Sequence, residues 1–510
     1  MHHIVRPYAR LVWENIPEQF SIAPQCLQDS CIEKAITTIY GKYVSYEDRW
    51  NHRRAFDQLR RSCIIRYSDE WNQNEYCPLV AEYETLLNAP NVLDFYLLTS
   101  MGFQILREHE WVRRVLNAKF PAILIDEYQD LGEHLHEMVL SLCFNGSSRL
   151  FAVGDPDQSI YGFTGACPER MKELTQKTEL VKEVRLRMNY RSHKKIITGS
   201  SAALEQQHDF DFYHNEEGTV RHYSIPDGFE SQIRYAFKEI LPAALTRREG
   251  RKLGDIGVLY CDKHQGGDVA KILDEEFQAY QYVRFDGGRQ YQKNQLTMWL
   301  EDCAAWCSEG NLSGKILLGD LIQHWMNFFT SQKKDSEVLQ CRKELVKFLM
   351  CKQNQNPNYR LQEWLHSFKE FGLYHRLKSE SFRTDEFEAL EKLYRLCQDG
   401  EKFSQYTVEM LGRQKGSPEH LNLTTIHSAK GLEYDVVIML GLERGILPHW
   451  NVQNINEQRR LFYVAMTRAR HEVHLLSSGW YADRNGKPHN DGHSPFIDDV
   501  LHQLDAESWF

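Results

Sequence analysis

The sequence predicts an α/β protein in which helices cover parallel sheets. The prediction rests on short apolar runs without Asp, Glu, Lys or Arg, at residues 122–125, 150–153, 256–260, 436–440 and 473–476. Runs of this length are typical of strands that are buried on both faces of a parallel sheet. Segments with helical patterning separate the runs, and this alternation indicates doubly wound domains.

The remaining segments have the patterning of helices. Residues 1–118 combine many aromatic residues with mixed charge, and residues 295–420 repeat apolar residues at three- and four-residue spacing. Such spacing predicts helices that bury one face, here within an insertion that packs on itself. The predicted organisation is a helical segment (1–118), a first sheet domain (119–205), and a second sheet domain (206–294 and 421–510) that contains the insertion.

The composition fits a soluble globular protein and excludes several functions. The 510 residues suffice for several domains of about 150 residues each. No apolar run approaches the roughly 20 residues of a membrane helix, and the first residues lack a signal peptide, so we expect a cytoplasmic protein. The 12 cysteines are scattered, which favours reduced core thiols over a metal site. The net charge of −10 argues against a simple DNA-coating protein but permits a local basic groove.

Two adjacent carboxylates follow the first predicted strand, in the segment AILIDEYQD at residues 122–130. Asp126 and Glu127 would lie at the carboxyl end of that strand, where α/β folds bind ligands. In a nucleotidase the first carboxylate would hold Mg²⁺ and the second would orient the attacking water. Taken alone, such a pair is more often a solvated acid pair at a strand end.

Further polar clusters argue against that simpler interpretation. The segment FAVGDPDQSIYGFTGA (151–166) carries Gln158, which could sense a terminal phosphate, and the aromatic residues Tyr161 and Phe163, which could stack on unpaired bases. The segment RLRMNYRS offers Tyr190 for stacking on a base and Arg191 for phosphate charge. Residues 423–449 and 457–470 supply Glu433, Arg460 and Arg468.

Together these segments resemble motifs II to VI of the UvrD/Rep/PcrA-type superfamily-one helicases. The matching strings are DEYQD, GDPDQSIY, NYRS, HSAKGLEYDVV and YVAMTRAR, in that family's order and roughly its spacing. The resemblance covers the chain from about residue 119 to its end. It implies two RecA-like parallel-sheet motor domains with helical accessory insertions, residues 295–420 being the insertion of the second motor domain.

The resemblance also implies that ATP and Mg²⁺ are cofactors, and it assigns roles by position. Asp126 resembles the Mg²⁺ ligand, Glu127 the catalytic base and Gln158 the γ-phosphate sensor. Arg191 and Arg468 resemble the arginines that contact the γ-phosphate. The other implied nucleotide contacts are Tyr190 on the adenine, Glu433 on the ribose, and Gly431 and Arg460. Tyr161 and Phe163 lie where the family stacks bases of single-stranded DNA, and His427 lies in the loop that contacts the strand.

The chain departs from the family pattern in its phosphate-binding loop. No G-x-x-x-x-G-K-[ST] string occurs, and the nearest one, GNLSGKI at 310–316, has the wrong spacing and lacks the hydroxyl residue. In the family this loop precedes the DEYQD block, so we expect the chain to begin just after it and the first motor domain to lack its N-terminal part. Without the loop's lysine and backbone N–H groups, the β- and γ-phosphates lose their main grip, and the hydrolysis rate should fall by orders of magnitude.

A second departure is Thr164, which stands where the family usually has an arginine. That arginine is thought to link the base-stacking aromatic residue to the ATP site. Threonine cannot make the charged contact, so the coupling of DNA binding to hydrolysis is in question.

The leading interpretation is a 3′-to-5′ DNA helicase or translocase subunit that binds single-stranded or partly duplex DNA. It would need a protein partner that supplies or covers the missing loop region. Helicases of this kind often accompany a nuclease in phage-defence systems such as Gabija, which makes a nuclease one candidate partner. The alternative is a non-catalytic DNA-binding or scaffolding subunit, but a scaffold has no need of the full set of Asp126, Glu127, Gln158, Arg191, Glu433 and Arg468.

Overall fold

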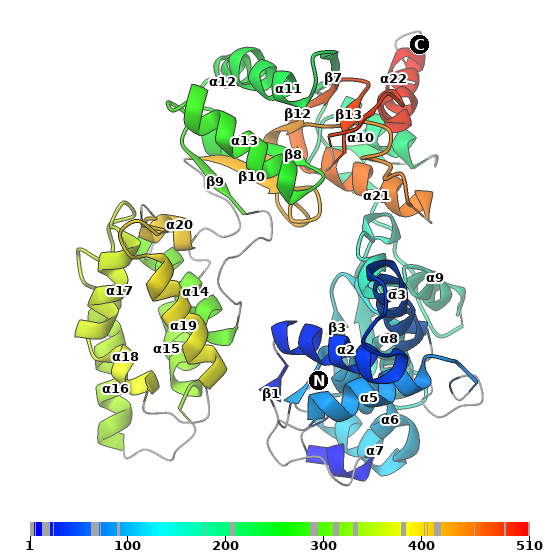
Figure 1. Ribbon diagram of the computed structural model, residues 1–510, viewed down its shortest axis with the longest axis vertical. Coiled ribbons are helices and arrows are strands. Elements are labelled where there is room, and N and C mark those ends of the chain that lie inside the picture. The colour runs from blue at the N-terminus through cyan, green and yellow to red at the C-terminus, as the bar shows by residue number, and fades with distance from the viewer. Residues whose placement is uncertain are drawn as a thin grey trace. The chain divides into compact units, whose positions relative to one another are not determined.

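In the computed structural model the chain forms two compact units, Met1–Leu186 and Arg187–Phe510 (Figure 1). The structure describes residues 5, 7–12, 21–23, 25–62, 71, 73–88, 92–177, 179–204, 210–285, 294–309, 316–329, 335–378, 384–401, 403–404, 406–412, 420–452, 454–483 and 486–507. Most of the string GNLSGKI therefore lies outside the described residues.

The first unit is mostly helical. Its helices are α2 (Gln25–Tyr40), α3 (Tyr46–Ser62), α5 (Cys77–Asn88), α6 (Phe95–Glu108), α7 (Glu110–Lys119), α8 (Glu133–Cys143) and α9 (Glu169–Gln176), with 3-10 turns η1 (Ala9–Leu11), η2 (Tyr128–Asp130), η3 (Pro156–Gln158) and η4 (Gly162–Thr164). Its strands are β1 (Ser21–Ile22), β2 (Val92–Leu93), β3 (Ala122–Ile125) and β4 (Arg149–Ala152). β1 pairs in parallel with β2, and β3 pairs in parallel with β4.

The β3–β4 pair is covered on one face only. Ile125 and Leu150 pack against a small core with Tyr128 and Val139. On the opposite face Leu124 and Phe151, which are cross-strand neighbours, are 75% and 65% exposed. The prediction that these runs are strands is confirmed. The prediction that they are buried on both faces is wrong, because no described element covers the second face.

The second unit contains a parallel sheet with the strand order β7-β12-β11-β8-β10-β9 among the described residues. These strands are β7 (Thr219–Ser224), β8 (Ile256–Tyr260), β9 (Tyr282–Arg284), β10 (Leu421–Thr425), β11 (Tyr434–Met439) and β12 (Ala469–Ser477). Short pairs are formed by β5 (Met188–Asn189) with β6 (Asp211–Phe212), and by β13 (Tyr481–Ala482) with β14 (Pro488–His489). The predicted runs 256–260, 436–440 and 473–476 thus fall on β8, β11 and β12.

Helices cover both faces of this sheet (Figure 1). One group is α11 (Phe229–Tyr235), the π-helical turn η5 (Ala236–Ile240), α12 (Leu241–Arg247) and α13 (Lys263–Glu276), with the turn η6 (Leu253–Asp255); the other is α10 (Lys194–Ala203), α21 (Ile455–Met466) and α22 (Pro495–Glu507). Successive residues of a strand point to opposite faces. Val436 and Ile438 of β11 accordingly lie in the core shared with α11 and α13. Here the predicted burial on both faces holds, since β8 and β10 are buried throughout.

Residues 187–205 belong to the second unit, whereas the sequence analysis places them in the first sheet domain. The physical reason is that α10 packs against α22 and β12. Its apolar residues Ile196 and Ile197 are buried there. The segment that carries Tyr190 and Arg191 therefore belongs to the same unit as the second sheet.

The insertion forms its own helical core. Its helices are α14 (Gln295–Glu309), α15 (Leu318–Asn327), α16 (Asp335–Leu349), α17 (Leu361–Glu370), α18 (Leu373–Lys378), α19 (Thr384–Leu396) and α20 (Val408–Gly412). Trp299 and Trp325 stack at its centre with ring centroids 5.0 Å apart. Cys303 and Cys307 are buried in the same core, and burial raises the pKa of the Cys307 thiol to about 12. Both residues are core thiols, in agreement with the sequence analysis.

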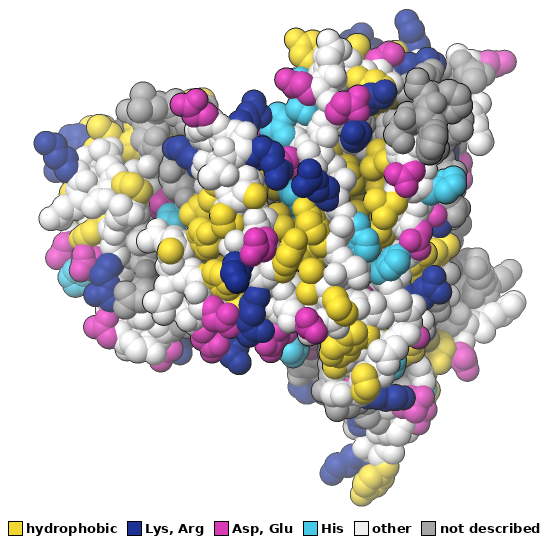
Figure 2. Space-filling model, turned by 90° about the horizontal axis from the view of Figure 1, so that it is seen from above, with side chains coloured by type: hydrophobic (Ala, Val, Ile, Leu, Met, Phe, Trp, Pro, Cys, Tyr) yellow, Lys and Arg dark blue, Asp and Glu magenta, His cyan; other side chains and the backbone are white. Residues whose placement is uncertain are grey.

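Among the described residues, no helix combines the length and the apolar character needed to cross a membrane. Figure 2 shows lysines and arginines interspersed with acidic side chains over the viewed face. This mixture agrees with the net charge of −10.

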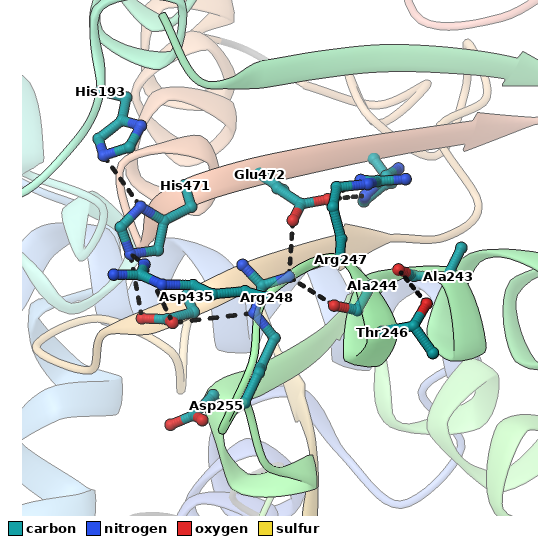
Figure 3. Close-up of polar contacts among 12 residues, drawn as sticks. His193, Ala243, Ala244, Thr246, Arg247, Arg248, Asp255, Asp435, His471 and Glu472 are labelled. Carbon is teal, nitrogen blue, oxygen red and sulfur yellow. Dashed lines mark hydrogen bonds and ion pairs between the residues drawn. The ribbon is translucent and has the colours of Figure 1, made fainter. Parts of the chain in front are cut away.

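A buried ion pair fastens the segment after α12 to β12 (Figure 3). Glu472 is 4% exposed, its Oε1 lies 2.6 Å from Arg251 Nη1, and it also pairs with Arg247. Burial alone would raise the pKa of Glu472, but its hydrogen bond with His474 and the guanidinium groups of Arg251 and Arg247 lower it to about 2. The carboxylate is therefore charged in the folded protein at neutral pH.

Replacing Glu472 by Gln should destabilise the second unit by about 3 kcal/mol at neutral pH, because it leaves the buried Arg251 with only Asp435, 3.8 Å away, as a counter-ion. The pKa of Glu472 is depressed below its ordinary value of 4.5, so its contribution is fully present above pH 4.5 and is lost as the pH falls through about 2. Urea unfolding at a series of pH values measures both effects, and the difference between the proteins should shrink over that window.

Glu276→Gln is the matched control. Glu276 also pairs with an arginine, Arg234, at 2.9 Å, but both side chains are exposed. The urea unfolding midpoint of Glu276→Gln should equal that of the wild type. An equal loss of stability in both variants would contradict the assigned role of the Glu472 pair.

Candidate functional site

The predicted catalytic carboxylates lie directly after β3. Asp126 and Glu127 are both exposed, and Asp126 Oδ1 accepts the backbone N–H of Glu127 at 2.9 Å. Glu127 has φ 54° and ψ 46°, the one positive φ outside glycine in the described part of the chain. Holding a non-glycine residue in this left-handed region costs about 1–3 kcal/mol, and such residues cluster at functional sites.

A buried glutamine joins this turn to the segment that follows β4. Gln129 is fully buried, and its Nε2 donates to Glu127 Oε2 at 2.5 Å. Its Oε1 accepts the backbone N–H of Asp155 at 3.0 Å. Asp155 Oδ2 in turn accepts from Gln158 Nε2 at 2.8 Å. The structure therefore brings Glu127 and Gln158 into one hydrogen-bonded network through a residue that sequence reasoning missed, although it stands inside the DEYQD string.

The close approach of the two segments requires a glycine at position 154. A Cβ on Gly154 would lie 2.4 Å from Gln129 Oε1 and 2.9 Å from both Tyr128 N and Met171 Sδ. Real Cβ atoms essentially never make contacts this short. Gly154 thus permits the backbone after β4 to reach the Gln129 amide.

These residues fit a magnesium ion. Mg²⁺ prefers hard oxygen ligands and is usually held by one or two carboxylates together with substrate phosphates. Asp126 and Glu127 supply exposed carboxylates at the carboxyl edge of a parallel strand pair, the usual ligand-binding edge.

The predicted base-stacking residues follow in the same unit. The rings of Tyr161 and Phe163 lie 6.1 Å apart at 66°, and Phe163 is 56% exposed. Burial, followed by the carboxylates of Asp130 and Glu127, raises the pKa of Tyr161. Thr164 Oγ1 donates to the carbonyl of Tyr161 at 2.8 Å, so the threonine is turned to its own backbone. Phe163 presents a ring that a base can reach.

In the second unit, Arg191 and Glu433 contact each other directly. Arg191 Nη2 lies 2.5 Å from Glu433 Oε1, and Arg470 Nη2 lies 3.1 Å from Glu433 Oε2. Burial alone would raise the pKa of Glu433, but Arg191 and Arg470 lower it overall. Glu433 precedes β11 and Arg470 lies at the start of β12, so this cluster occupies the amino edge of the sheet. Arg470, which sequence reasoning missed, stands two residues beyond the predicted Arg468.

Arg468 itself points into the protein. It is 1% exposed, and its guanidinium donates to the carbonyls of Val464 at 3.0 Å and Leu432 at 3.4 Å. Its predicted contact with a γ-phosphate stays a prediction. In this conformation the accessible guanidinium groups near Glu433 are those of Arg191 and Arg470.

The remaining predicted residues lie in the same unit. Tyr190 is 67% exposed and has a neighbour that the sequence did not indicate, Tyr213, whose ring centroid lies 5.1 Å away. Gly431 has φ 82°, which favours glycine in the turn before Glu433. Arg460 is half-buried on α21, and His427, also half-buried, has its pKa lowered by burial.

Comparison with known proteins finds the same family at both ends of the chain. The family model of the UvrD/REP helicase N-terminal domain matches residues 11–179, and that of the UvrD-like helicase C-terminal domain matches residues 320–478. ATP-dependent DNA helicase Rep of Escherichia coli (strain K12) is 26% identical over 443 residues, 77% of this chain and 65% of Rep. ATP-dependent DNA helicase PcrA of Staphylococcus aureus (strain Mu50) is 24% identical over 485 residues, 83% of this chain and 63% of PcrA. The chain thus spans about two thirds of the length of the curated relatives it matches.

Gln129→Leu should uncouple the two segments of the first unit. The leucine keeps the approximate size but removes the acceptor of the partly buried N–H of Asp155, and an unsatisfied donor costs up to about 1–3 kcal/mol. Hydrogen exchange of the Asp155 amide should therefore become faster. Gln104→Leu is the control, because that side chain bonds only at the surface, to Glu108. Unchanged exchange at Asp155 in Gln129→Leu would refute the bridging role.

Proposed function

The chain belongs to the UvrD/Rep helicase family, and on that premise we propose that it is an ATP- and Mg²⁺-dependent subunit that translocates 3′ to 5′ along single-stranded DNA. The observation that carries the proposal is the network of the first unit, in which Gln129 joins Glu127 to the segment that carries Gln158. A purely structural loop has no need to hold an exposed glutamate in a left-handed conformation.

In this proposal each side chain has a role that follows from its chemistry. Asp126 holds Mg²⁺, which when bound neutralises phosphate charge. Glu127 orients a water molecule and accepts its proton, while the Gln158 amide, fixed by Asp155, senses the terminal phosphate. In the second unit Arg191 offers phosphate charge, and Tyr190 with its neighbour Tyr213 offers a stacking surface for a base.

We further propose that the grip on the β- and γ-phosphates comes from another polypeptide segment. The printed sequence contains no G-x-x-x-x-G-K-[ST] string. The exposed face of the β3–β4 pair, with Leu124 and Phe151, suits a partner with an apolar surface that would complete this sheet. Burying both side chains would be favourable by roughly 1.5–3 kcal/mol each.

One observation favours the alternative of a DNA-binding subunit without ATP turnover. Thr164 stands where the family usually has a charged residue, and its hydroxyl donates to the carbonyl of Tyr161. The retained Asp126, Glu127 and Gln158 weigh against this alternative, because DNA binding through stacking does not use them.

Single-stranded DNA should bind through Tyr161 and Phe163, and the double variant Tyr161→Ala, Phe163→Ala should bind more weakly. Base stacking contributes about 1–3 kcal/mol per base, so a loss of tenfold or more in affinity is expected. Fluorescence anisotropy with a labelled oligonucleotide measures the affinity, which should also fall steeply with salt.

Tyr43→Ala is the control for that measurement, since Tyr43 is 97% exposed in the same unit and no role is assigned to it. The affinity of Tyr43→Ala for the labelled oligonucleotide should equal that of the wild type. If the double variant also binds like the wild type, the proposed DNA surface is incorrect.

The β3–β4 pair should be less stable than the second sheet in the isolated chain. Hydrogen exchange should be faster at amides 122–125 and 150–153 than at amides 436–439 of the buried strand β11, because unpaired edges and an exposed face protect poorly. Equal protection in a monomer would show that the sheet needs no completing partner.

A further inference from the structure

A histidine-rich cluster in the second unit lies outside every site described above. His193 begins the turn before α10, and His214 and Glu216 lie in the loop between β6 and β7. A ring nitrogen of each histidine and a carboxylate oxygen of Glu216 all lie within 4.8 Å of one another. We propose that His193, His214 and Glu216 bind a divalent transition-metal ion, with Zn²⁺ as the best match.

The hydrogen bond of His214 leaves one ring nitrogen available for a metal. His214 Nε2 lies 3.0 Å from the carbonyl of Tyr190. A carbonyl can only accept, so Nε2 carries the proton, and the lone pair of the neutral ring is on Nδ1. Histidine ligands of metals typically donate their other N–H to a carbonyl or carboxylate in this way.

His193 also contacts His471, which lies beside Arg248 and Asp435 (Figure 3). His471 Nδ1 lies 2.9 Å from His193 Nε2, while His471 Nε2 contacts a guanidinium nitrogen of Arg248 and lies 3.6 Å from Asp435 Oδ1.

His193 Nε2 also lies 2.9 Å from Glu216 Oε2. A proton on Nε2 joins these two groups as a hydrogen bond. A bound metal ion would replace that proton between the ring nitrogen and the carboxylate oxygen. It would satisfy His193, His214 and Glu216 together.

The dimensions of the cluster suit zinc. Zn²⁺ binds histidine nitrogen and carboxylate oxygen at about 2.0–2.2 Å, which places tetrahedral ligand atoms roughly 3.4 Å apart. The three ligand atoms lie within 4.8 Å of one another, so they would have to move only slightly closer together to bind one ion. Glu216 is exposed and His214 half-buried, so both can adjust, while His193 is buried and fixed. A water molecule would complete the tetrahedron from the exposed side.

The backbone around the cluster is already ordered. Lys195 N donates to the carbonyl of Glu217 at 2.8 Å, and His193 N donates to the carbonyl of Arg470 at 2.9 Å. The nearby guanidinium of Arg248 is paired with Asp435 at 3.7 Å, which reduces its repulsion of a cation. A metal ion here would tie the Tyr190-bearing segment to the loop after β6. The site needs neither nucleotide nor DNA, so its test is independent of the proposed function.

The test is metal binding by the full chain after removal of metal with a chelator. Isothermal titration with Zn²⁺ should show one site that His214→Ala and Glu216→Gln each weaken by at least about tenfold. His366→Ala is the control, since His366 and Glu370 form an exposed pair at 3.3 Å within one helix. This control variant should bind Zn²⁺ like the wild type.

Titration with Co²⁺ identifies the ligand atoms. Nitrogen and oxygen ligands give weak visible bands, whereas cysteine ligands add an intense sulfur-to-metal charge-transfer band. Wild-type binding that lacks the sulfur band and is lost in His214→Ala and Glu216→Gln supports the proposal. No binding by the wild type, unchanged binding in these variants, or a sulfur band would overturn it.

Discussion

The buried amide of Gln129 is the interaction on which the chemistry of the first unit depends. A strand end alone would present Asp126 and Glu127 as solvated carboxylates without a fixed geometry. Gln129 bonds Glu127 on one side and the backbone of Asp155 on the other. The left-handed turn at Glu127 and the glycine at position 154 are the local conditions that let this amide reach both partners. These contacts fix the geometry of the proposed site within the protein itself, and preorganisation of this kind favours electrostatic catalysis.

In the second unit two glutamates each form ion pairs with two arginines. Glu433 pairs with Arg191 and Arg470, while Glu472 pairs with Arg251 and Arg247. Arg191 and Glu433 are partly exposed at the amino edge of the sheet, whereas Arg251 and Glu472 are buried. In the proposed function Arg191 offers its charge to a phosphate, and its pairing with Glu433 orients the guanidinium.

The sequence allowed the strands and the chemically active residues to be predicted, but not the contacts between them. Runs such as 256–260 are strands because continuous apolar residues need burial on both faces, and β8 meets that need. The same pattern at 122–125 led to a wrong prediction of burial. Apolar residues indicate that a strand is stabilised by burial on both faces, but they do not indicate whether another element covers each face. β7 escaped prediction because its sequence TVRHYS mixes polar with apolar residues. Gln129, Arg470 and Tyr213 also escaped, because their roles arise from partners distant in the sequence or across a turn, which no local pattern encodes.

In the proposed function, this chain holds Asp126 and Glu127 in place for ATP hydrolysis, while another polypeptide segment supplies the grip on the phosphates. The most direct test is ATP turnover by the purified chain, with and without single-stranded DNA, beside Glu127→Gln. The account predicts turnover near background in every case, because the β- and γ-phosphates lack their cationic and backbone cradle. Turnover that is stimulated by single-stranded DNA and abolished by Glu127→Gln would contradict it, and would show that residues of this chain hold the phosphates themselves.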